Sequence, residues 1–288
     1  MNDASIKVLM DYLPTDWWRR KSTCQILLNW FKRYLLGLFL SVEIEGKVQH
    51  GLYTGFLLLY KENLMWATAG HIIDEIREIK SNPNVRIVRM RWLDDSKISG
   101  AESVPVHSSN FRTYSATEFG IDFGVADITG LDRENILKNN RIEIMTEQGW
   151  KNLHLANPEG YYIIGYPKEW VETNEVRLPN NRILGSVLAN AACIPVEQIE
   201  YPGKHPTKEF WNDPRAFYGR MLPYSDEPGH QPENIKGMSG GPLISIERTP
   251  NREFRYRLFG IQRSWDENTR SIRVEPIENI IPRDEYLM

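Results

Sequence analysis

Apolar residues recur at helical spacing near the start of the chain, over about residues 16–35. Trp17, Leu28 and Phe31 belong to this repeat, and basic residues such as Lys32 stand between its members. The pattern predicts one amphipathic helix. Its basic face could meet a membrane or a partner, but the more common arrangement is a solvated charged face opposite an apolar face that packs on the main domain.

After this segment the pattern changes to short apolar runs, rich in β-branched and aromatic residues and separated by polar residues, glycine or proline. The runs cover residues 38–45, 55–60, 64–67, 85–92, 123–128, 161–165, 183–192, 217–223, 242–247, 256–262 and 271–274. Because they do not alternate regularly with long amphipathic helices, they predict an all-β fold built as a sandwich or as barrels. Short helices are expected only at residues 72–79 and 133–138.

Two stretches have few strand signals, residues 94–118 and residues 131–157. The first is polar and is expected to form surface loops. The second is expected to contain the boundary between two β units, near residue 150. A chain of 288 residues that is 41% hydrophobic is long enough for two units that each bury a core.

Charge and cysteine content narrow the class of protein. The chain has 25% charged residues and a formal net charge of -3, without the basic excess of a protein that follows a phosphate backbone, so no nucleic-acid partner is expected. Cys24 and Cys193 are the only cysteines, which is typical of a protein that keeps its thiols reduced. The sequence does not decide whether these two cysteines form one disulfide.

Two features of the N-terminal region indicate a soluble, cytoplasmic protein. Residues 1–16 contain acids and a proline where a secretory signal would need a basic start and an apolar run. The most apolar stretch, residues 26–42, is interrupted by Asn29, Lys32 and Arg33. It is therefore too short and too polar to span a bilayer.

The most informative segment is Gly-Met-Ser-Gly-Gly-Pro at residues 237–242, which leads directly into an apolar run. Glycines on both sides allow Ser239 to occupy a tight turn, with an exposed Oγ and with backbone N–H groups aimed at one point. A glycine-rich loop alone is more often a plain turn. This segment, however, resembles the Gly-x-Ser-Gly-Gly-Pro motif of the trypsin-like, chymotrypsin-fold serine peptidases.

Two further motifs are similar to those of the same family. Residues 68–71, Thr-Ala-Gly-His, resemble its Thr-Ala-x-His segment, a setting that none of the other histidines has. Residues 121–126, Ile-Asp-Phe-Gly-Val-Ala, resemble its Asp-Ile-Ala-Leu strand and select Asp122, with Asp127 as a rival whose following residues fit less well. The chain order His, Asp, Ser is that of the chymotrypsin architecture.

The resemblance covers most of residues 38–275, weakly between the motifs. It implies two antiparallel β-barrels, the first over residues 37–150 with the histidine and the aspartate, the second over residues 151–288 with the serine and a short C-terminal segment. A helical extension over residues 1–36 precedes them.

The same resemblance implies a serine endopeptidase in which Ser239 is the nucleophile, His71 is the general base and Asp122 orients that base. The N–H groups of Gly237 and Ser239 would hold the oxyanion. Met238 stands where secreted trypsins carry the aspartate of their zymogen-activation ion pair, so the chain is similar to bacterial members that need no such cleavage. No cofactor is implied.

Substrate preference stays open from the sequence. Glu233 stands six residues before Ser239, where a trypsin-type pocket would carry its acid, and it favours basic side chains before the scissile bond. Arg263 on the facing edge could cancel that charge or favour acidic substrates. The candidate pocket residues are Glu233, Gln262, Arg263, Ser264 and Trp265.

Two alternatives remain. One is a catalytically silent relative that keeps the fold and holds a peptide in its cleft, although an intact set of three catalytic residues argues against it. The other is a peptidase that acts only with a regulatory protein partner, as in a bacterial stress or defence system.

A metalloprotease or a phosphate-binding enzyme is not expected, because the chain has no His-Glu-x-x-His motif, no Cys/His ligand cluster and no Walker-type loop.

Overall fold

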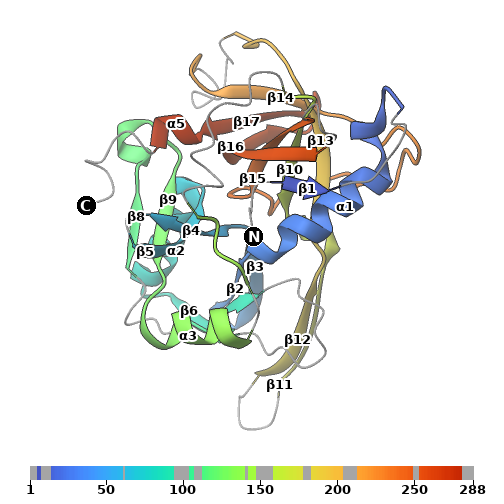
Figure 1. Cartoon of the computed structure of the whole chain (residues 1–288). Helices are drawn as coiled ribbons and strands as arrows, with labels where there is room; N and C mark the ends of the chain where they lie inside the picture. Colours follow the sequence, from blue (N-terminus) through green and yellow to red (C-terminus); the bar gives the residue numbers. More distant parts are fainter. Residues whose placement is uncertain are drawn as a thin grey trace.

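Antiparallel strands are the main regular structure of the described chain, at 47% of its residues, so the expected all-β class is confirmed (Figure 1). The computed structural model describes residues 5–7, 14–60, 62–93, 104–106, 112–139, 142–146, 158–177, 183–203, 213–248 and 253–280. Its elements are β1 (Ser5–Lys7), α1 (Lys21–Phe31), β2 (Gly37–Ile44), β3 (Lys47–Tyr53), β4 (Phe56–Tyr60), β5 (Asn63–Thr68), α2 (Gly70–Ser81), β6 (Val85–Leu93), β7 (Val104–Pro105), β8 (Thr113–Ser115), β9 (Gly124–Asp127), α3 (Gly130–Asn139), β10 (Gly160–Gly165), β11 (Val171–Arg177), β12 (Ile183–Ala189), β13 (Ala192–Gln198), β14 (Phe217–Met221), β15 (Pro242–Arg248), β16 (Glu253–Asp266), β17 (Ser271–Pro276) and α5 (Ile277–Ile280).

The C-terminal half contains a closed barrel. Its strands are hydrogen-bonded in the order β16-β15-β10-β13-β14-β17, and the pairing of β17 with β16 closes the circle. Side chains that alternate along these strands fill the interior, as in other small barrels. Ile163, Ile194, Leu243 and Ile272 belong to this buried cluster.

The N-terminal half contains two four-stranded sheets, ordered β3-β2-β6-β7 and β4-β5-β9-β8. Their shared core includes Trp66 and Trp92, whose rings meet edge to face with centroids 5.3 Å apart. The indole N–H of Trp66 donates to the carbonyl of Leu36 at 2.7 Å, so this buried polar group is satisfied. α2 adds Ile72 and Ile76 to the same core.

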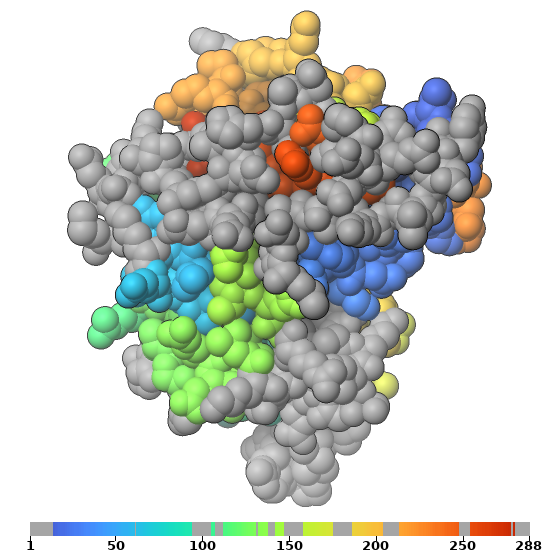
Figure 2. Space-filling view, viewed as in Figure 1, coloured from blue at the N-terminus to red at the C-terminus, as the bar shows by residue number. Residues whose placement is uncertain are grey.

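α1 confirms the predicted amphipathic helix, and its apolar face packs on the rest of the molecule. Phe31 meets Tyr256 of β16 edge to face at 5.0 Å. The segment just before the helix is tied to the closed barrel, because the indole of Trp17 donates to Glu159 at 3.0 Å and the hydroxyl of Tyr162 donates to the carbonyl of Trp18 at 2.8 Å. In Figure 2 the blue residues of this N-terminal region form part of the surface beside the orange and red C-terminal strands.

Cys24 of α1 and Cys193 of β13 are both free and buried, so the structure has no bridge between them. Burial raises the pKa of the Cys193 thiol well above its ordinary value, and the neighbouring Cys24 acts in the same direction. Within the described ranges, no helix is long and apolar enough to cross a membrane.

Strands with polar sequences are where the structure departs from the sequence prediction. β3, Lys-Val-Gln-His-Gly-Leu-Tyr, is not among the predicted runs, but it pairs with β2 through a two-residue turn at Glu45 and Gly46. Both turn residues have positive φ values, 51° and 77°, as tight hairpin turns require. β11 was missed for the same reason and pairs with β12 in an arm that extends from the molecule in Figure 1.

Three further predictions concern the short helices, the stretch 94–118 and the boundary near residue 150. Both short helices are confirmed, as α2 and α3. The stretch 94–118, expected to be loop, contains the short strands β7 and β8 in its described part. The proposed boundary near residue 150 falls at 147–157, outside the described residues.

Candidate active site

His71 and Asp122 are held together by three hydrogen bonds. His71 lies in the first turn of α2, and its backbone N–H donates to Oδ1 of Asp122 at 2.8 Å. Its ring Nδ1 is 2.9 Å from Oδ2 and 3.2 Å from Oδ1 of the same carboxylate. Because an ionised carboxylate only accepts hydrogen bonds, the ring proton lies on Nδ1 and Nε2 is left as an acceptor.

Gly124 allows this close approach. It opens β9 two residues after Asp122, and α2 passes directly over it. A Cβ at this position would lie 2.5 Å from Cγ1 of Ile73 and 3.2 Å from Cα of Gly70. The small residue of the 121–126 motif is therefore required by the packing of α2 against β9.

The charges of the pair shift both pKa values. Burial lowers the pKa of His71, but the hydrogen bond and the charge of Asp122, with that of Glu75, outweigh it and raise the pKa above its ordinary value. Burial raises the pKa of Asp122, but the hydrogen bond and charge of His71, with the charge of Arg263, hold it below its ordinary value. Asp122 is nearly buried, whereas the side chain of His71 is 46% exposed and accessible to a bound molecule.

Ser239 lies on a loop that glycines shape. Gly237 and Gly240 have positive φ values of 93° and 90°, a region that other residues rarely adopt. The loop is pinned to β16, because the N–H of Gly240 donates to the carbonyl of Gln262 at 2.7 Å and the N–H of Gln262 donates to the carbonyl of Gly241 at 2.8 Å. Ser239 therefore lies in a tight, glycine-dependent turn, as the 237–242 motif predicts.

Replacing Gly240 by alanine is expected to destabilise the protein more than the matched Gly229→Ala variant. The two glycines have φ values of 90° and 99°, so each substitution carries a similar backbone strain of about 1–2 kcal/mol. Only at Gly240 would the new Cβ lie 2.0 Å from Oγ1 of Thr68 and 2.3 Å from the carbonyl oxygen of Thr54, which adds roughly 1–3 kcal/mol. Urea unfolding of both variants measures the difference, and equal losses of stability would contradict this packing.

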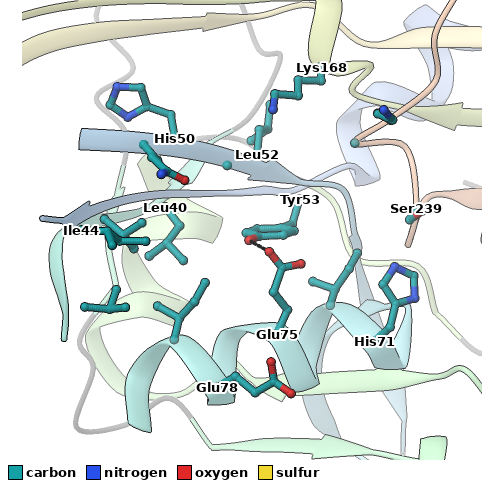
Figure 3. Close-up of a pocket in the computed structure, with 18 of the residues that line it drawn as sticks. Leu40, Ile44, His50, Leu52, Tyr53, His71, Glu75, Glu78, Lys168 and Ser239 are labelled. Atoms are coloured by element: carbon teal, nitrogen blue, oxygen red, sulfur yellow. Dashed lines mark hydrogen bonds between the residues drawn. The ribbon is translucent and has the colours of Figure 1, made fainter. Parts of the chain in front are cut away.

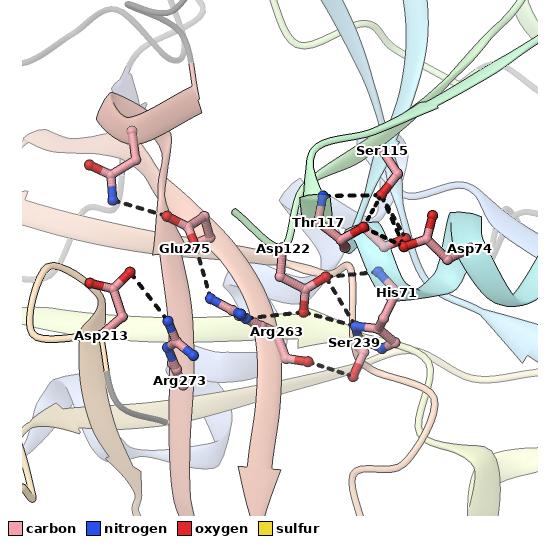
Figure 4. A network of polar contacts seen from close by, with 12 residues as sticks. His71, Asp74, Ser115, Thr117, Asp122, Asp213, Ser239, Arg263, Arg273 and Glu275 are labelled. Atoms are coloured by element: carbon pink, nitrogen blue, oxygen red, sulfur yellow. Dashed lines mark hydrogen bonds and ion pairs between the residues drawn. The ribbon is translucent and has the colours of Figure 1, made fainter. Parts of the chain in front are cut away.

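The hydroxyl of Ser239 donates to the carbonyl of Arg263 at 3.3 Å (Figure 4). Within the described residues it makes no hydrogen bond to His71. The backbone N–H groups of Gly237 and Ser239 likewise donate to no acceptor in the described part of the chain. The Ser239 hydroxyl thus points to Arg263 and not to His71. The N–H groups of Gly237 and Ser239 are left without an acceptor among the described residues.

Ser239 and His71 both line two cavities. The first has a volume of about 610 Å³ and lies between β3 and α2 (Figure 3). Its apolar lining consists of Leu40, Val42, Ile44, Leu52, Ile72, Ile79 and Val85. The second has a volume of about 430 Å³ and is lined by Thr117, Asp122, Arg263, Ser264 and Trp265 in addition to the two shared residues.

The structure brings some of the predicted pocket residues to the serine and not others. Ser264 and Trp265 line the second cavity. Gln262 is fully buried and contacts the Ser239 loop through its backbone. Glu233 lines neither of these cavities, because its segment is held elsewhere by the hydrogen bond of 2.8 Å from its N–H to the carboxylate of Glu169.

Arg263, which was also predicted to be a pocket residue, lines the second cavity too, but its guanidinium is largely buried and lies beside two carboxylates. Its Nε lies 3.1 Å from Oδ2 of Asp122. Its Nη1 donates to Oε2 of Glu275 at 3.2 Å. This arrangement could not be predicted from the sequence, since Arg273 and Glu275 alternate with apolar residues on β17 as solvent-facing residues do, yet both are 1% exposed.

Asp127, the rival aspartate, lies at the end of β9 and lines neither cavity. Its N–H donates to the carbonyl of Arg112 at 2.9 Å. Asp122 is the aspartate that contacts His71.

Comparison with known proteins gives structural neighbours only. No family model matches the chain, and no curated protein matches its sequence. Similar solved structures include the protease Anisep from Arthrobacter nicotinovorans (TM-score 0.44, 11% identity, 85% of this chain and 90% of that chain). Others are the active form of a protease from M. tuberculosis (0.44, 11%, 98% and 93%) and a Glu endopeptidase (0.41, 12%, 96% and 95%).

These neighbours are chymotrypsin-fold serine proteases, the family that the three motifs resemble. Identities and TM-scores this low establish no activity for this chain.

Proposed function

We propose that this chain is a serine endopeptidase in which Ser239 attacks a peptide carbonyl, His71 accepts the proton of the hydroxyl and Asp122 orients His71. The observation that carries the proposal is the 2.9 Å hydrogen bond between Nδ1 of His71 and Asp122. It leaves Nε2 as an acceptor on a ring that lines the same two cavities as Ser239.

The reaction begins when the Ser239 hydroxyl rotates from the carbonyl of Arg263 towards Nε2 of His71. As Oγ bonds to the substrate carbonyl carbon, the proton moves to Nε2 and the carbonyl oxygen becomes an oxyanion. The N–H groups of Gly237 and Ser239 are assigned to this oxyanion, and each such donor contributes on the order of 3 kcal/mol in comparable sites.

The same groups complete the reaction, and His71 now acts first as an acid and then again as a base. Protonated His71 donates its proton to the leaving nitrogen, the peptide C–N bond breaks and an acyl-enzyme remains on Ser239. Water then attacks the ester and gives a proton to His71, which returns that proton to Oγ of Ser239 as the ester C–O bond breaks and the new carboxylate end is released. Asp122 remains ionised throughout and stabilises the protonated imidazole.

The substrate is assigned as an extended peptide that crosses Ser239 from one cavity to the other. Ser264 and Trp265 are the candidates for contact with the side chain before the scissile bond. A trypsin-like preference for basic side chains is not supported by Glu233, which lines neither cavity. The free thiols of Cys24 and Cys193 support a reducing, cytoplasmic location.

Peptide hydrolysis is expected to fall with decreasing pH as His71 becomes protonated. Neutral His71 is the active form, and its pKa lies above the ordinary value, so activity is lost at a higher pH than free imidazole would give. Asp122 has a lowered pKa and stays charged across this range, so one protonation sets the acid limb. Cleavage of a peptide library, followed by mass spectrometry and by kcat/KM against pH for one cleaved peptide, measures this. Cleavage that persists well below the ordinary histidine range would contradict the role of His71.

One observation favours the silent binding module, namely the hydrogen bond of the Ser239 hydroxyl to the Arg263 carbonyl in place of His71. Peptide binding without any cleavage in the library experiment would select that function. New peptide termini that appear only when the wild-type protein is present would favour the peptidase.

A further inference from the structure

A chain of buried charges leads away from Asp122 into the closed barrel (Figure 4). Arg263 of β16 lies between two carboxylates, 3.1 Å from Oδ2 of Asp122 and 3.2 Å from Oε2 of Glu275. The side chains of Asp122 and Arg263 are 9% exposed and that of Glu275 is 1% exposed. Buried charges of this kind are strongly destabilising when one partner is removed, so the three groups act as a set.

The far end of this chain is held in place from several directions. The amide of Asn279 donates to Oε1 of Glu275 at 2.9 Å, while Arg263 contacts Oε2. Arg273, on the same strand as Glu275, pairs with Asp213 at 3.4 Å. The Arg263 guanidinium therefore has a fixed anchor on β17, and its Nε lies at ion-pair distance from Asp122 without a hydrogen bond to it.

The imidazole of His71 and the guanidinium of Arg263 thus share one carboxylate. Oδ2 of Asp122 is 2.9 Å from Nδ1 of His71 and 3.1 Å from Nε of Arg263. The backbone carbonyl of Arg263 also accepts a hydrogen bond from the Ser239 hydroxyl. One residue therefore contacts both the nucleophile candidate and the group that orients its base.

We propose that Arg263 is a positioning residue, which fixes the Asp122 carboxylate against His71, and that it does not bind acidic substrate side chains. This inference rests on the proposed peptidase function. Asp122 and Glu275 already offset the charge of the guanidinium at ion-pair distance, so an acidic substrate side chain would meet no net positive charge there. The positive charge also acts on the base, because it opposes protonation of His71 while Asp122 and Glu75 favour it.

The test replaces Arg263 by methionine, which keeps the length of the side chain and removes the charge. With the cation gone, the His71 titration measured by NMR and the acid limb of kcat/KM are both expected to move to higher pH. A looser Asp122 is expected to lower kcat by roughly tenfold to a hundredfold, because small misplacements of catalytic groups have effects of this order, with little change in KM. Arg263→Lys, which keeps the charge, is expected to leave the acid limb near its wild-type position.

Arg257→Met is the matched control, since Arg257 is a buried arginine of the same strand that lines neither cavity. It is expected to leave the acid limb unchanged. If R263M does not fold because Glu275 has lost its partner, the double variant R263M/E275Q removes both charges. Its titration is still expected to move to higher pH, because the charge of Arg263 lowers the pKa of His71, whereas Glu275 is not among the groups that shift it.

Two results would overturn the proposal. One is an unchanged His71 titration in R263M or in the double variant. The other is a rise in KM confined to peptides with an acidic residue before the scissile bond, which would make Arg263 a specificity residue. The NMR titration needs no turnover, so it decides the role of Arg263 even if the wild-type protein cleaves no peptide and the proposed function fails.

Discussion

The Ser239→Ala variant is expected to lose peptidase activity almost completely while it folds as the wild type does. Removal of a serine nucleophile lowers kcat by about a millionfold in comparable enzymes. The hydroxyl of Ser239 makes one hydrogen bond of 3.3 Å in the structure, to the carbonyl of Arg263. Its loss is expected to change the free energy of unfolding by only about 1 kcal/mol.

Activity and urea unfolding of the same purified samples measure the two effects. Ser81→Ala is the matched control, because Ser81 is an exposed serine at the end of α2 that lines neither cavity. It is expected to retain full activity. Residual cleavage by S239A at more than a small fraction of the wild-type rate would contradict the role of Ser239.

The second large effect is expected from Asp122→Asn, with a loss in kcat of about 10⁴-fold. The reason lies in the hydrogen bonds. Oδ1 of Asp122 accepts the backbone N–H of His71 and Oδ2 faces the ring Nδ1. An asparagine that keeps its oxygen on the backbone N–H turns its NH2 group towards the ring, which places the imidazole proton on Nε2 and removes the acceptor for Ser239.

The amide in that orientation would also face Nε of Arg263, 3.1 Å from the replaced oxygen, so two donors would meet without an acceptor. Asp127→Asn is the matched control, on the same strand segment but in neither cavity. Steady-state kinetics of the two variants make the comparison. Similar activity in D122N and D127N would show that Asp122 does not orient the base.

Residue types with strong local requirements made part of the site predictable from the sequence. Gly237 and Gly240 need positive φ values, and Gly240 has no room for a Cβ, so the loop that bears Ser239 left a recognisable pattern. The packing of α2 over Gly124 did the same for the aspartate segment. The pairing of His71 with Asp122 was expected from the resemblance of these segments to family motifs, and the structure brings the two side chains together.

Other parts could not be predicted because the sequence signal was absent or misleading. β3 is polar along most of its length, so apolar runs did not reveal it, and it is defined by a turn at Glu45 and Gly46. Arg263 and Glu275 carry charges that normally indicate exposure, and only the pairing of β16 with β17 brings them together in the interior. Glu233 was placed by counting back from Ser239 through a long loop, and counting gives no information on where such a loop folds.

The most direct test of the account is the reaction of the purified protein with a fluorophosphonate probe, with the adduct located by peptide mass spectrometry. The probe reacts only with a serine that a neighbouring base activates. The account predicts one adduct, on Ser239, which is absent in Ser239→Ala and greatly reduced in His71→Ala. A folded wild-type protein that forms no adduct on Ser239, either purified or in cell lysate, would contradict the claim that His71 activates this serine.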